Sequence, residues 1–299
     1  MKTKINITQK LLFIVFSILI IIACDREETL QPTAIFENGE PESTTEIDQF
    51  LKKEFRDPYG SVIHYKFVDK FIDPTKSATP PRIDVVQPIA ELIKQAWIEP
   101  YNKASNQGGE FLGTYFPAEI VILGSPLFNS NGTITLGVAD SGVRVTLTQA
   151  NEYTPDNTAW IVQTFRTLHH EFAHIIDQNF KFDIESFFRI SEDNYTSSGT
   201  WFNLSDEQAL QRGMVTPYAT SSPAEDFAET MAYIITTEPD VFEATYITPE
   251  TCDGTPGCIA RNEGKARIKE KYDVIIKYMK EDVGIDVNIL RDEFLNSIN

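Results

Sequence analysis

The chain has 299 residues and carries 44 acidic against 26 basic side chains, a formal net charge of −18 at pH 7. Such a surface repels nucleic acid and anionic lipid head groups, so neither is an expected ligand. Hydrophobic residues make up 41% of the chain and include 20 Phe and 11 Tyr, which predicts a large buried core and excludes a disordered chain.

The amino terminus has the pattern of a bacterial targeting segment. Three lysines precede an apolar run over residues 11–22, which is too short to span a bilayer comfortably. The run ends in Ile-Ile-Ala before Cys24, which resembles a lipobox, the motif whose cysteine is lipidated and becomes the first residue of the processed chain. We therefore predict a lipoprotein signal peptide over residues 1–23, with an uncleaved membrane anchor as the alternative.

The segment that follows predicts how the chain is attached. Residues 24–45 are rich in Glu, Pro and Thr without an apolar period, so we expect a flexible tether from the lipidated Cys24. The run Asp25-Arg26-Glu27-Glu28 resembles the acidic tract that sends Bacteroidota lipoproteins to the cell surface, although a solvated linker explains it equally well. These features predict an outer-membrane lipoprotein, exposed on the cell surface and held to the membrane by its lipid anchor.

Residues 46–147 predict a mixture of helices and strands. Apolar spacing indicates helices over Ile47–Phe55 and from Ile83 to about Ala104, with a strand over Ser61–Phe67 between them. Three β-branched runs follow, separated by Asn-Gly and Ser-Gly turns: Glu119–Leu123, Ile134–Val138 and Val143–Leu147.

The next predicted helix, from about Asn157 to Asn179, carries the motif His170-Glu171-Phe172-Ala173-His174. Histidines four residues apart lie on one helix face about one turn apart, so both imidazoles can bind one metal ion. Glu171 then lies beside the water that a bound zinc activates, where a general base is needed. A chance match on a helix surface is the alternative.

The same helix has an apolar stripe at helical spacing, formed by Ile161, Phe165, Leu168, Phe172 and Ile175. His170 lies roughly opposite this stripe. We therefore expect the stripe to face the core and the histidines to face a cleft.

A catalytic zinc site keeps three protein ligands and one open position. A third histidine of the metzincin type is absent, because Phe180 stands six residues after His174. We expect a carboxylate from another helix, and Glu225 and Glu229 lie four residues apart after a Ser-Pro helix start. One carboxylate can bind zinc while the other accepts the ring N–H of a ligand histidine. A solvated acidic helix face is the alternative.

The remaining segments predict loops and helices. The aromatic and polar residues 181–222 are expected to form loops and short helices over the cleft, with an ordinary core under long loops as the alternative. Helices are predicted over Ala224–Ile235, from Ala260 to about Lys280, and over Asn288–Ile298. Cys252 and Cys258 flank a turn-forming Asp-Gly-Thr-Pro-Gly, and outside the cytoplasm we expect them to form a disulfide, since two cysteines alone do not make a structural zinc site.

The pairing of His-Glu-Phe-Ala-His with Glu-Asp-Phe-Ala-Glu resembles the gluzincin arrangement of the anthrax lethal factor catalytic domain, over residues 165–235. Most of the chain is also similar to a group of Bacteroidota lipoproteins described as substrate-import-associated zinc metallohydrolases. The first resemblance implies His170, His174 and Glu225 as zinc ligands and Glu171 as the general base.

The same resemblance implies two further roles. Glu229 would hold a ligand histidine from behind, and Tyr218, seven residues before Glu225, would stabilise the oxyanion. Nothing in the chain resembles the peptide-recognition regions of the toxin, so its substrate does not transfer.

Together these features predict an α+β fold with a zincin-like domain over residues 46–299, in which a small mixed sheet packs on the active-site helix and a mostly helical C-terminal lobe follows. The domain is expected to bind one Zn²⁺ per chain and to hydrolyse a peptide or protein substrate. The second resemblance implies an outer-membrane nutrient-import complex as partner. The alternatives are a hydrolase of another amide or ester, and a non-catalytic binding lipoprotein with a vestigial metal site, against which the intact Glu171 argues.

Overall fold

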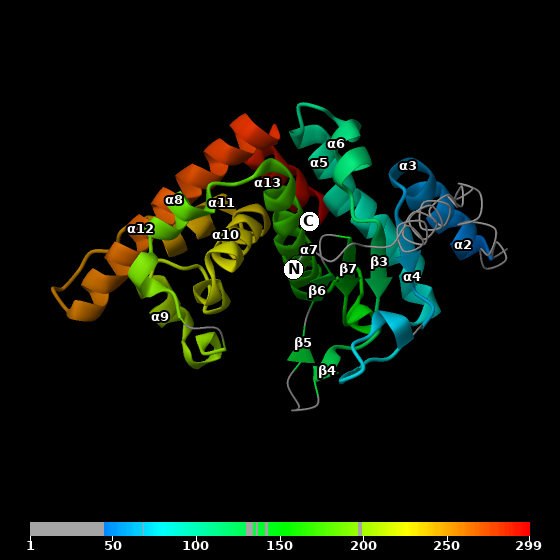
Figure 1. Ribbon diagram of the computed structural model, residues 1–299, viewed down its shortest axis with the longest axis horizontal. Helices are drawn as coiled ribbons and strands as arrows, with labels where there is room; N and C mark the ends of the chain where they lie inside the picture. The colour runs from blue at the N-terminus through cyan, green and yellow to red at the C-terminus, as the bar shows by residue number, and fades with distance from the viewer. Residues whose placement is uncertain (1–44, 68, 130–133, 136, 141–142, 197–198) are drawn as a thin grey trace, which may run out of the picture. The chain divides into compact units, whose positions relative to one another are not determined.

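The computed structural model describes residues 45–67, 69–129, 134–135, 137–140, 143–196 and 199–299 (Figure 1). Within these ranges, the residues from Thr45 to Asn299 cluster into one unit. The signal peptide, Cys24 and the tether up to residue 44 lie outside the described residues, as do the Asn131-Gly132 and Ser141-Gly142 turns. In the part of the chain that is described, no helix combines the length and the apolarity needed to cross a membrane.

A four-stranded mixed sheet organises the first half of this unit. Its strand order is β1 (Val62–His64), β3 (Glu119–Ile122), β7 (Arg144–Leu147) and β6 (Gly137–Asp140). The first three strands are parallel, and β6 runs antiparallel to β7 at the edge. The β-branched residues of β3 and β7 are buried, as expected where a parallel sheet is covered on both faces.

A second, three-stranded antiparallel sheet contains β2 (Lys76–Ser77), β4 (Leu127–Asn129) and β5 (Ile134–Thr135). The prediction of one strand over Ile134–Val138 was wrong, because this run is divided between β5 and β6, which belong to different sheets. Local β propensity cannot reveal where a run changes its partner strand, since pairing is decided by contacts remote in sequence.

The two helices predicted before the sheet are confirmed, although each contains a π-helical segment. The first comprises α2 (Glu46–Leu51), a π-helical turn over Lys52–Arg56 and α3 (Asp57–Tyr59). The second comprises α4 (Ile83–Ile93), a π-helical turn over Lys94–Ile98 and α5 (Glu99–Ala104). A further helix, α6 (Gly109–Tyr115), was not predicted, because two glycines at its start hide the short apolar pattern.

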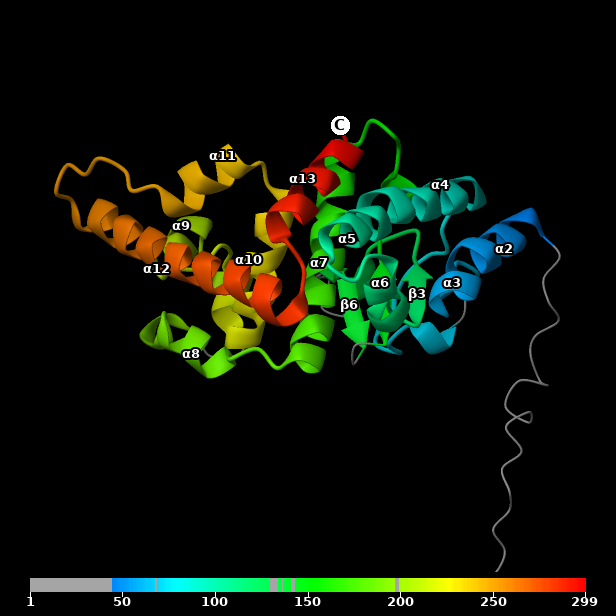
Figure 2. The same ribbon diagram turned by 90° about the horizontal axis from the view of Figure 1, so that it is seen from above.

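The helix that carries the histidine motif, α7 (Thr158–Phe180), lies between the sheet and the C-terminal helices (Figure 2). It contacts β6 and β7 on one side and α10 (Pro223–Thr236) along the other. The C-terminal lobe is otherwise made of short and long helices: α8 (Ile184–Arg189), α9 (Asp206–Gln211), α11 (Pro239–Phe242), α12 (Pro256–Tyr278) and α13 (Val287–Ser297). This confirms the predicted α+β class, with a small sheet on the motif helix and a helical C-terminal lobe.

A fully buried ion pair joins α10 to α12. Lys271 Nζ lies 2.6 Å from Asp226 Oδ2, and both side chains are inaccessible to solvent. The Tyr195 hydroxyl donates to the same carboxylate at 2.7 Å, and Lys271 also donates to the Gly213 carbonyl at 2.7 Å. Because every charge here has a partner, the pair fixes the start of α10 against α12.

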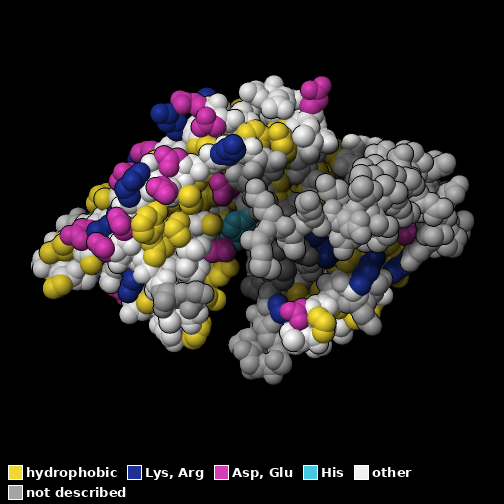
Figure 3. Space-filling model, in the orientation of Figure 1, with side chains coloured by type: hydrophobic (Ala, Val, Ile, Leu, Met, Phe, Trp, Pro, Cys, Tyr) yellow, Lys and Arg dark blue, Asp and Glu magenta, His cyan; other side chains and the backbone are white. Residues whose placement is uncertain are grey.

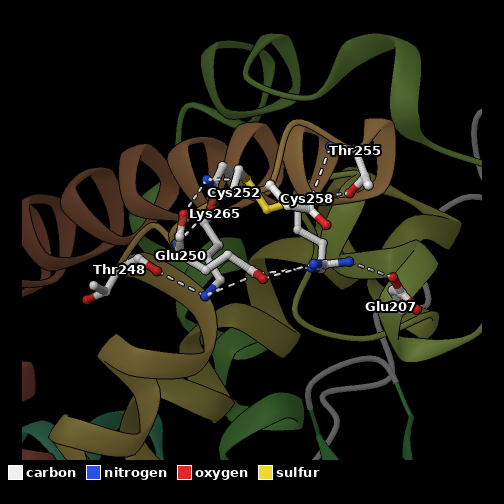
Figure 4. Close-up of a disulfide and its surroundings, with 10 residues drawn as sticks. Glu207, Thr248, Glu250, Cys252, Thr255, Cys258 and Lys265 are labelled. Atoms are coloured by element: carbon white, nitrogen blue, oxygen red, sulfur yellow. Dashed lines mark hydrogen bonds and ion pairs between the residues drawn. A yellow bond between two sulfur atoms is a disulfide. The ribbon is translucent and has the colours of Figure 1, made fainter.

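A disulfide between Cys252 and Cys258 closes the loop at the start of α12 (Figure 4). Arg261, one turn further along, donates to Glu250, just before this loop, and to Glu207 of α9, each at 2.9 Å. Lys265 donates to the carbonyl groups of Ala244 and Thr248 at 3.0 and 2.9 Å. The loop therefore ties α9 and the segment before it to α12.

Candidate metal centre

The start of α7 is fixed next to the loop that follows β7. The Asn157 side chain accepts from the Trp160 backbone N–H at 3.2 Å, which caps the helix. The Trp160 ring donates to the Gln149 carbonyl at 2.8 Å, and Gln149 itself has a left-handed φ of 59°. These contacts set the direction of the helix and hence the position of its histidines, which come three turns later.

The apolar stripe of α7 is buried as predicted, but the opposite face is not simply open. Helix α10 covers it, so the side chain of His170 is only 9% exposed, whereas that of His174 is 21% exposed. The expectation that the histidines avoid the packed surface was therefore wrong for His170. His169 is also fully buried, with its Nδ1 atom 3.4 Å from the Tyr101 hydroxyl.

Helix α10 begins at the predicted Ser-Pro signal. The Ser222 hydroxyl accepts from the Glu225 backbone N–H at 3.2 Å, and Pro223 occupies the first helical position. Carboxylates in a first helical turn are stabilised by the positive end of the helix dipole. This geometry directs Glu225 and, one turn later, Glu229 toward α7.

Three atoms that can bind a metal converge between the two helices. Glu225 Oε2 lies 3.0 Å from His170 Nε2 and 3.4 Å from His174 Nε2, and the two Nε2 atoms are 3.2 Å apart. Donor atoms about 2.0–2.1 Å from a tetrahedral zinc ion lie about 3.3 Å from one another. Glu225 Oε2 is buried and accepts no hydrogen bond among the described residues. The triangle thus has the size, the donor types and the unsatisfied buried oxygen that suit a zinc ion.

The other side of His170 is held by Glu229, whose Oε1 lies 2.8 Å from His170 Nδ1. A carboxylate accepts, so Nδ1 carries a proton, and Nε2 can present a lone pair to the triangle once its own proton is released. Burial opposes a charge on His170, yet the adjacent carboxylates of Glu225 and Glu229 outweigh it and raise the pKa of His170 to about 10. Burial alone would raise the pKa of Glu225, but the two imidazoles hold it well below its usual range. The carboxylates of the centre therefore favour a positive charge between His170 and Glu225.

Glu171 lies beside the triangle without being one of its three corners. Its nearest oxygen and the nearest imidazole nitrogens of His170 and His174 all lie within 4.8 Å of one another. Burial raises the pKa of Glu171, and the two imidazoles oppose this shift. Glu225 approaches the Nε2 atoms more closely, which leaves the Glu171 carboxylate free to contact a bound water or substrate.

The ring of Tyr218 also lies at the centre, 5.9 Å from the His170 ring. Burial and the neighbouring Glu225 carboxylate raise the pKa of Tyr218 above its ordinary value, so the hydroxyl keeps its proton at neutral pH. The space-filling view shows a histidine in a hollow of the surface, with acidic and hydrophobic side chains beside it (Figure 3). A protonated hydroxyl at such a position can donate to an oxygen that gains negative charge.

One polar residue of the centre escaped the sequence analysis. The Thr216 hydroxyl donates to Glu229 Oε2 at 2.6 Å and accepts from the Ala219 backbone N–H at 3.1 Å. A threonine in a loop carries no motif, so only its position beside Glu229 reveals it. The buried Asp226 was likewise hidden, because in sequence it reads as one more member of an acidic run.

Several other titratable residues and the disulfide lie away from the centre. His64, on β1, lies 3.2 Å from Glu119 of β3 and is not part of the centre. A surface cavity of about 450 Å³ between α5 and α13 is lined by Glu99, Lys103 and Glu293 and contains no residue of the centre. The Cys252–Cys258 disulfide contributes no atom to the centre, and Cys24 lies outside the described residues.

A motif helix beside a small mixed sheet, with two histidines, a candidate glutamate base and a candidate carboxylate ligand from a second helix, is typical of a metallohydrolase of the zincin-like class. The chain belongs to the family described as "Putative zinc-binding metallo-peptidase", whose model matches residues 40–288. At the level of this family it is a zinc metallopeptidase.

A solved structure supports the same assignment. The chain is similar to a crystal structure of "a putative zinc-binding metallo-peptidase" from Bacteroides caccae, with 28% sequence identity and a TM-score of 0.68. The similarity covers 89% of this chain and 96% of that chain. No curated protein matches the sequence.

Proposed function

We propose that the protein is a surface-anchored zinc metallopeptidase of the gluzincin type, with one zinc ion per chain held by His170, His174 and Glu225. The observation that carries this proposal is the convergence of two Nε2 atoms and one Oε2 atom at 3.0–3.4 Å. A histidine pair and one carboxylate leave the fourth position of a tetrahedral zinc open for water or substrate.

His170, His174 and Glu225 would hold the zinc ion, which would supply a Lewis acid for polarising a carbonyl group and for activating a water at neutral pH. Glu171 accepts the proton of the attacking water and then passes it to the leaving amine. Burial raises the pKa of Glu171, and this direction of shift makes the carboxylate a better proton acceptor in the first step. Glu229 fixes the proton of His170 on Nδ1 and so keeps Nε2 directed at the metal.

Tyr218 stabilises the oxygen on which negative charge develops. Its hydroxyl remains protonated because burial and the Glu225 carboxylate raise its pKa. A preorganised donor of this kind is typically worth about 3–4 kcal/mol of transition-state stabilisation.

The sheet supports a peptide or protein as the substrate. Among the described strands, β6 pairs only with β7, so its other edge is available for an extended chain. The same strand contacts α7, which carries the histidine motif. An extended peptide that adds to this edge by backbone hydrogen bonds would run past the centre.

Surface anchoring completes the proposal. The lipobox-like run before Cys24, the tether and the acidic residues after the cysteine support an outer-membrane lipoprotein that faces the medium, and a nutrient-import complex is the proposed partner. Replacing Cys24 by Ser should release the protein from the membrane fraction. Retention of the Cys24→Ser protein in washed membranes would remove the lipid anchor from the proposal.

Glu171→Gln tests the catalytic role directly. The variant should bind zinc with wild-type stoichiometry, since Glu171 is not a corner of the triangle. It should lose at least about 100-fold in kcat, because general acid–base catalysis typically contributes about 10²–10⁴. Zinc content is measured by atomic absorption, and turnover is measured on a mixed peptide library with and without a chelator.

The same experiment separates the alternatives. A non-catalytic binding lipoprotein would leave the library intact in the wild type as well, whereas a hydrolase of another amide or ester would spare peptides but act on small ester or amide probes. Normal turnover by Glu171→Gln would exclude this residue as the base.

A further inference from the structure

We propose that Thr216 is a positioning residue that orients Glu229, and through it His170, and that couples the metal ligand to the Tyr218 turn. This inference rests on the proposed function. It concerns the loop between α9 and the 3₁₀ turn Tyr218–Ser221, where no motif marks a functional residue.

The direction of the Thr216 hydroxyl is set by its two neighbours. The Ala219 backbone N–H can only donate, so at 3.1 Å it uses a lone pair of Thr216 Oγ1. A carboxylate can only accept, so the hydroxyl hydrogen points to Glu229 Oε2 at 2.6 Å. The short distance is typical of a hydrogen bond to a charged acceptor, which is stronger than one between neutral groups.

Both oxygens of Glu229 are therefore engaged. Oε2 accepts from Thr216, and Oε1 lies 2.8 Å from His170 Nδ1. A carboxylate held at both oxygens cannot rotate away from the imidazole. The chain of contacts from Thr216 through Glu229 thus fixes the plane and the proton of the His170 ring.

The Thr216 hydroxyl also contacts the turn that carries Tyr218, through the Ala219 backbone N–H. Ala219 directly follows Tyr218, whose ring lies 5.9 Å from the His170 ring. One hydroxyl therefore connects the turn that carries the candidate oxyanion donor to the carboxylate that holds a candidate metal ligand. A loop threonine that only closed its own turn would not need to contact Glu229.

Zinc affinity tests this role without relying on turnover. In the full-length protein, Thr216→Val should lower zinc affinity about tenfold, the lower end of what loss of an outer partner of a metal ligand costs. Thr216→Ser keeps the hydroxyl and should retain the wild-type value. Affinity is measured by competition with a chromogenic chelator, and circular dichroism checks that each variant is folded.

Thr220→Val is the matched control, because Thr220 lies in the same turn but donates to the Pro217 carbonyl at 2.7 Å. It should leave zinc affinity unchanged. A second comparison uses the Glu229→Ala background, in which Thr216→Val should have no further effect if Thr216 acts through Glu229.

Two outcomes would overturn the inference. One is an unchanged zinc affinity in Thr216→Val. The other is a tenfold loss of zinc affinity on Thr216→Val that is the same in the wild-type and the Glu229→Ala backgrounds. A different result would contradict the proposed function. It is wrong if Thr216 affects zinc affinity through Glu229 as expected but the wild-type protein cleaves no peptide.

A second observation, on the surface beside Tyr218, carries an independent inference. We infer that Trp201 and Phe202 form a subsite for a large apolar or aromatic side chain of the substrate. The Trp201 ring meets the Tyr218 ring edge-on at 5.1 Å, and the Phe202 ring lies 5.9 Å from Trp201. Phe202 is 63% exposed, so a substrate side chain can reach it.

The position of these rings identifies their occupant. The rings of His170, Tyr218, Trp201 and Phe202 follow one another in this order, each next to the following one. A peptide bound at the centre would therefore place a side chain near its scissile bond against Trp201 and Phe202. Aromatic and apolar surfaces beside a few polar groups are the usual lining of a ligand site. This inference also rests on the proposed function.

Cleavage of a peptide library with every residue varied around the bond tests the subsite. Wild-type protein should prefer large apolar residues at one position, with kcat/KM at least about tenfold above that for alanine there. Trp201→Ala should abolish this preference, while Phe67→Ala, which removes another exposed phenylalanine, should keep it. Cleavage without such a preference in the wild type, or an unchanged preference in Trp201→Ala, would refute the subsite.

Discussion

At the scale of single residues, the centre is defined by which of its polar atoms have a hydrogen-bond partner and which do not. His170 has a carboxylate at each ring nitrogen, but only Glu229 completes a hydrogen bond to a ring N–H. Glu225 Oε2 stays buried without a donor. A metal ion at the triangle would satisfy the oxygen and both imidazole lone pairs together.

Tyr218→Phe removes the candidate oxyanion donor and the interaction of its hydroxyl with Glu225. Its kcat should fall by about 10²–10³, the usual cost of losing one such donor, because the hydroxyl acts on charge that appears only in the transition state. Zinc content should stay at the wild-type level, since the hydroxyl is not a corner of the triangle. Steady-state kinetics and metal analysis of the same preparation check both statements. A loss of zinc in this variant would instead assign Tyr218 to the metal site.

At the scale of elements, the contact of α10 with α12 depends on the buried pair of Asp226 and Lys271. Lys271→Met should lower the free energy of unfolding by about 3–5 kcal/mol, because it leaves a buried carboxylate without its cation. Urea denaturation with a chelator present measures this change without a contribution from zinc.

Lys269→Met is the control for that experiment, since Lys269 pairs with Asp273 on an exposed helix face. It should change stability by no more than about 0.5 kcal/mol. Equal losses in the two variants would mean that the buried pair has no special role in holding α10.

The three parallel strands are joined by a cluster whose stability depends on pH. His64 of β1 lies 3.2 Å from Glu119 of β3, and Arg144 of β7 donates to the same carboxylate at 2.7 Å. Burial lowers the pKa of His64, partly opposed by Glu119. The unfolded chain therefore binds more protons than the folded chain as the pH falls below about 6.5, and stability is lost in that direction.

The His64→Gln variant tests this dependence. The free energy of unfolding of the wild type should fall more steeply than that of the variant between pH 6.5 and pH 5. Urea titrations at several pH values, with a chelator in every sample, give the two curves. Parallel curves would show that His64 titrates alike in both states.

At the scale of the whole molecule, the candidate metal centre lies between α7 and α10, because two of its donor atoms come from one helix and the third from the other. Zinc bound only by the folded chain should raise the free energy of unfolding by about 2.7 kcal/mol at a free concentration 100 times Kd. Calorimetry with and without a chelator measures the shift, and magnesium serves as the control because it prefers all-oxygen sites. An unfolding temperature indifferent to zinc would remove the ion from this centre.

Local spacing determined much of what the sequence alone could reveal. The four-residue step places His170 and His174 on one turn in any α-helix, and the same step pairs Glu225 with Glu229. Ser222 and Pro223 start α10 through contacts within one turn, and Cys252 and Cys258 are separated by a tight loop. All these features depend on neighbours a few residues away, so pattern and propensity predict them without a fold.

Only the tertiary structure decided how these local pieces meet. Helix packing places Glu225 next to both imidazoles and Glu229 behind one of them, although the four-residue spacing alone does not distinguish the two. It also buries His170, brings Thr216 to Glu229 and divides residues 134–140 between two sheets. These outcomes depend on contacts between segments distant in the chain, where the closeness of side chains is set by the packing of whole helices and strands and not by the order of neighbouring residues.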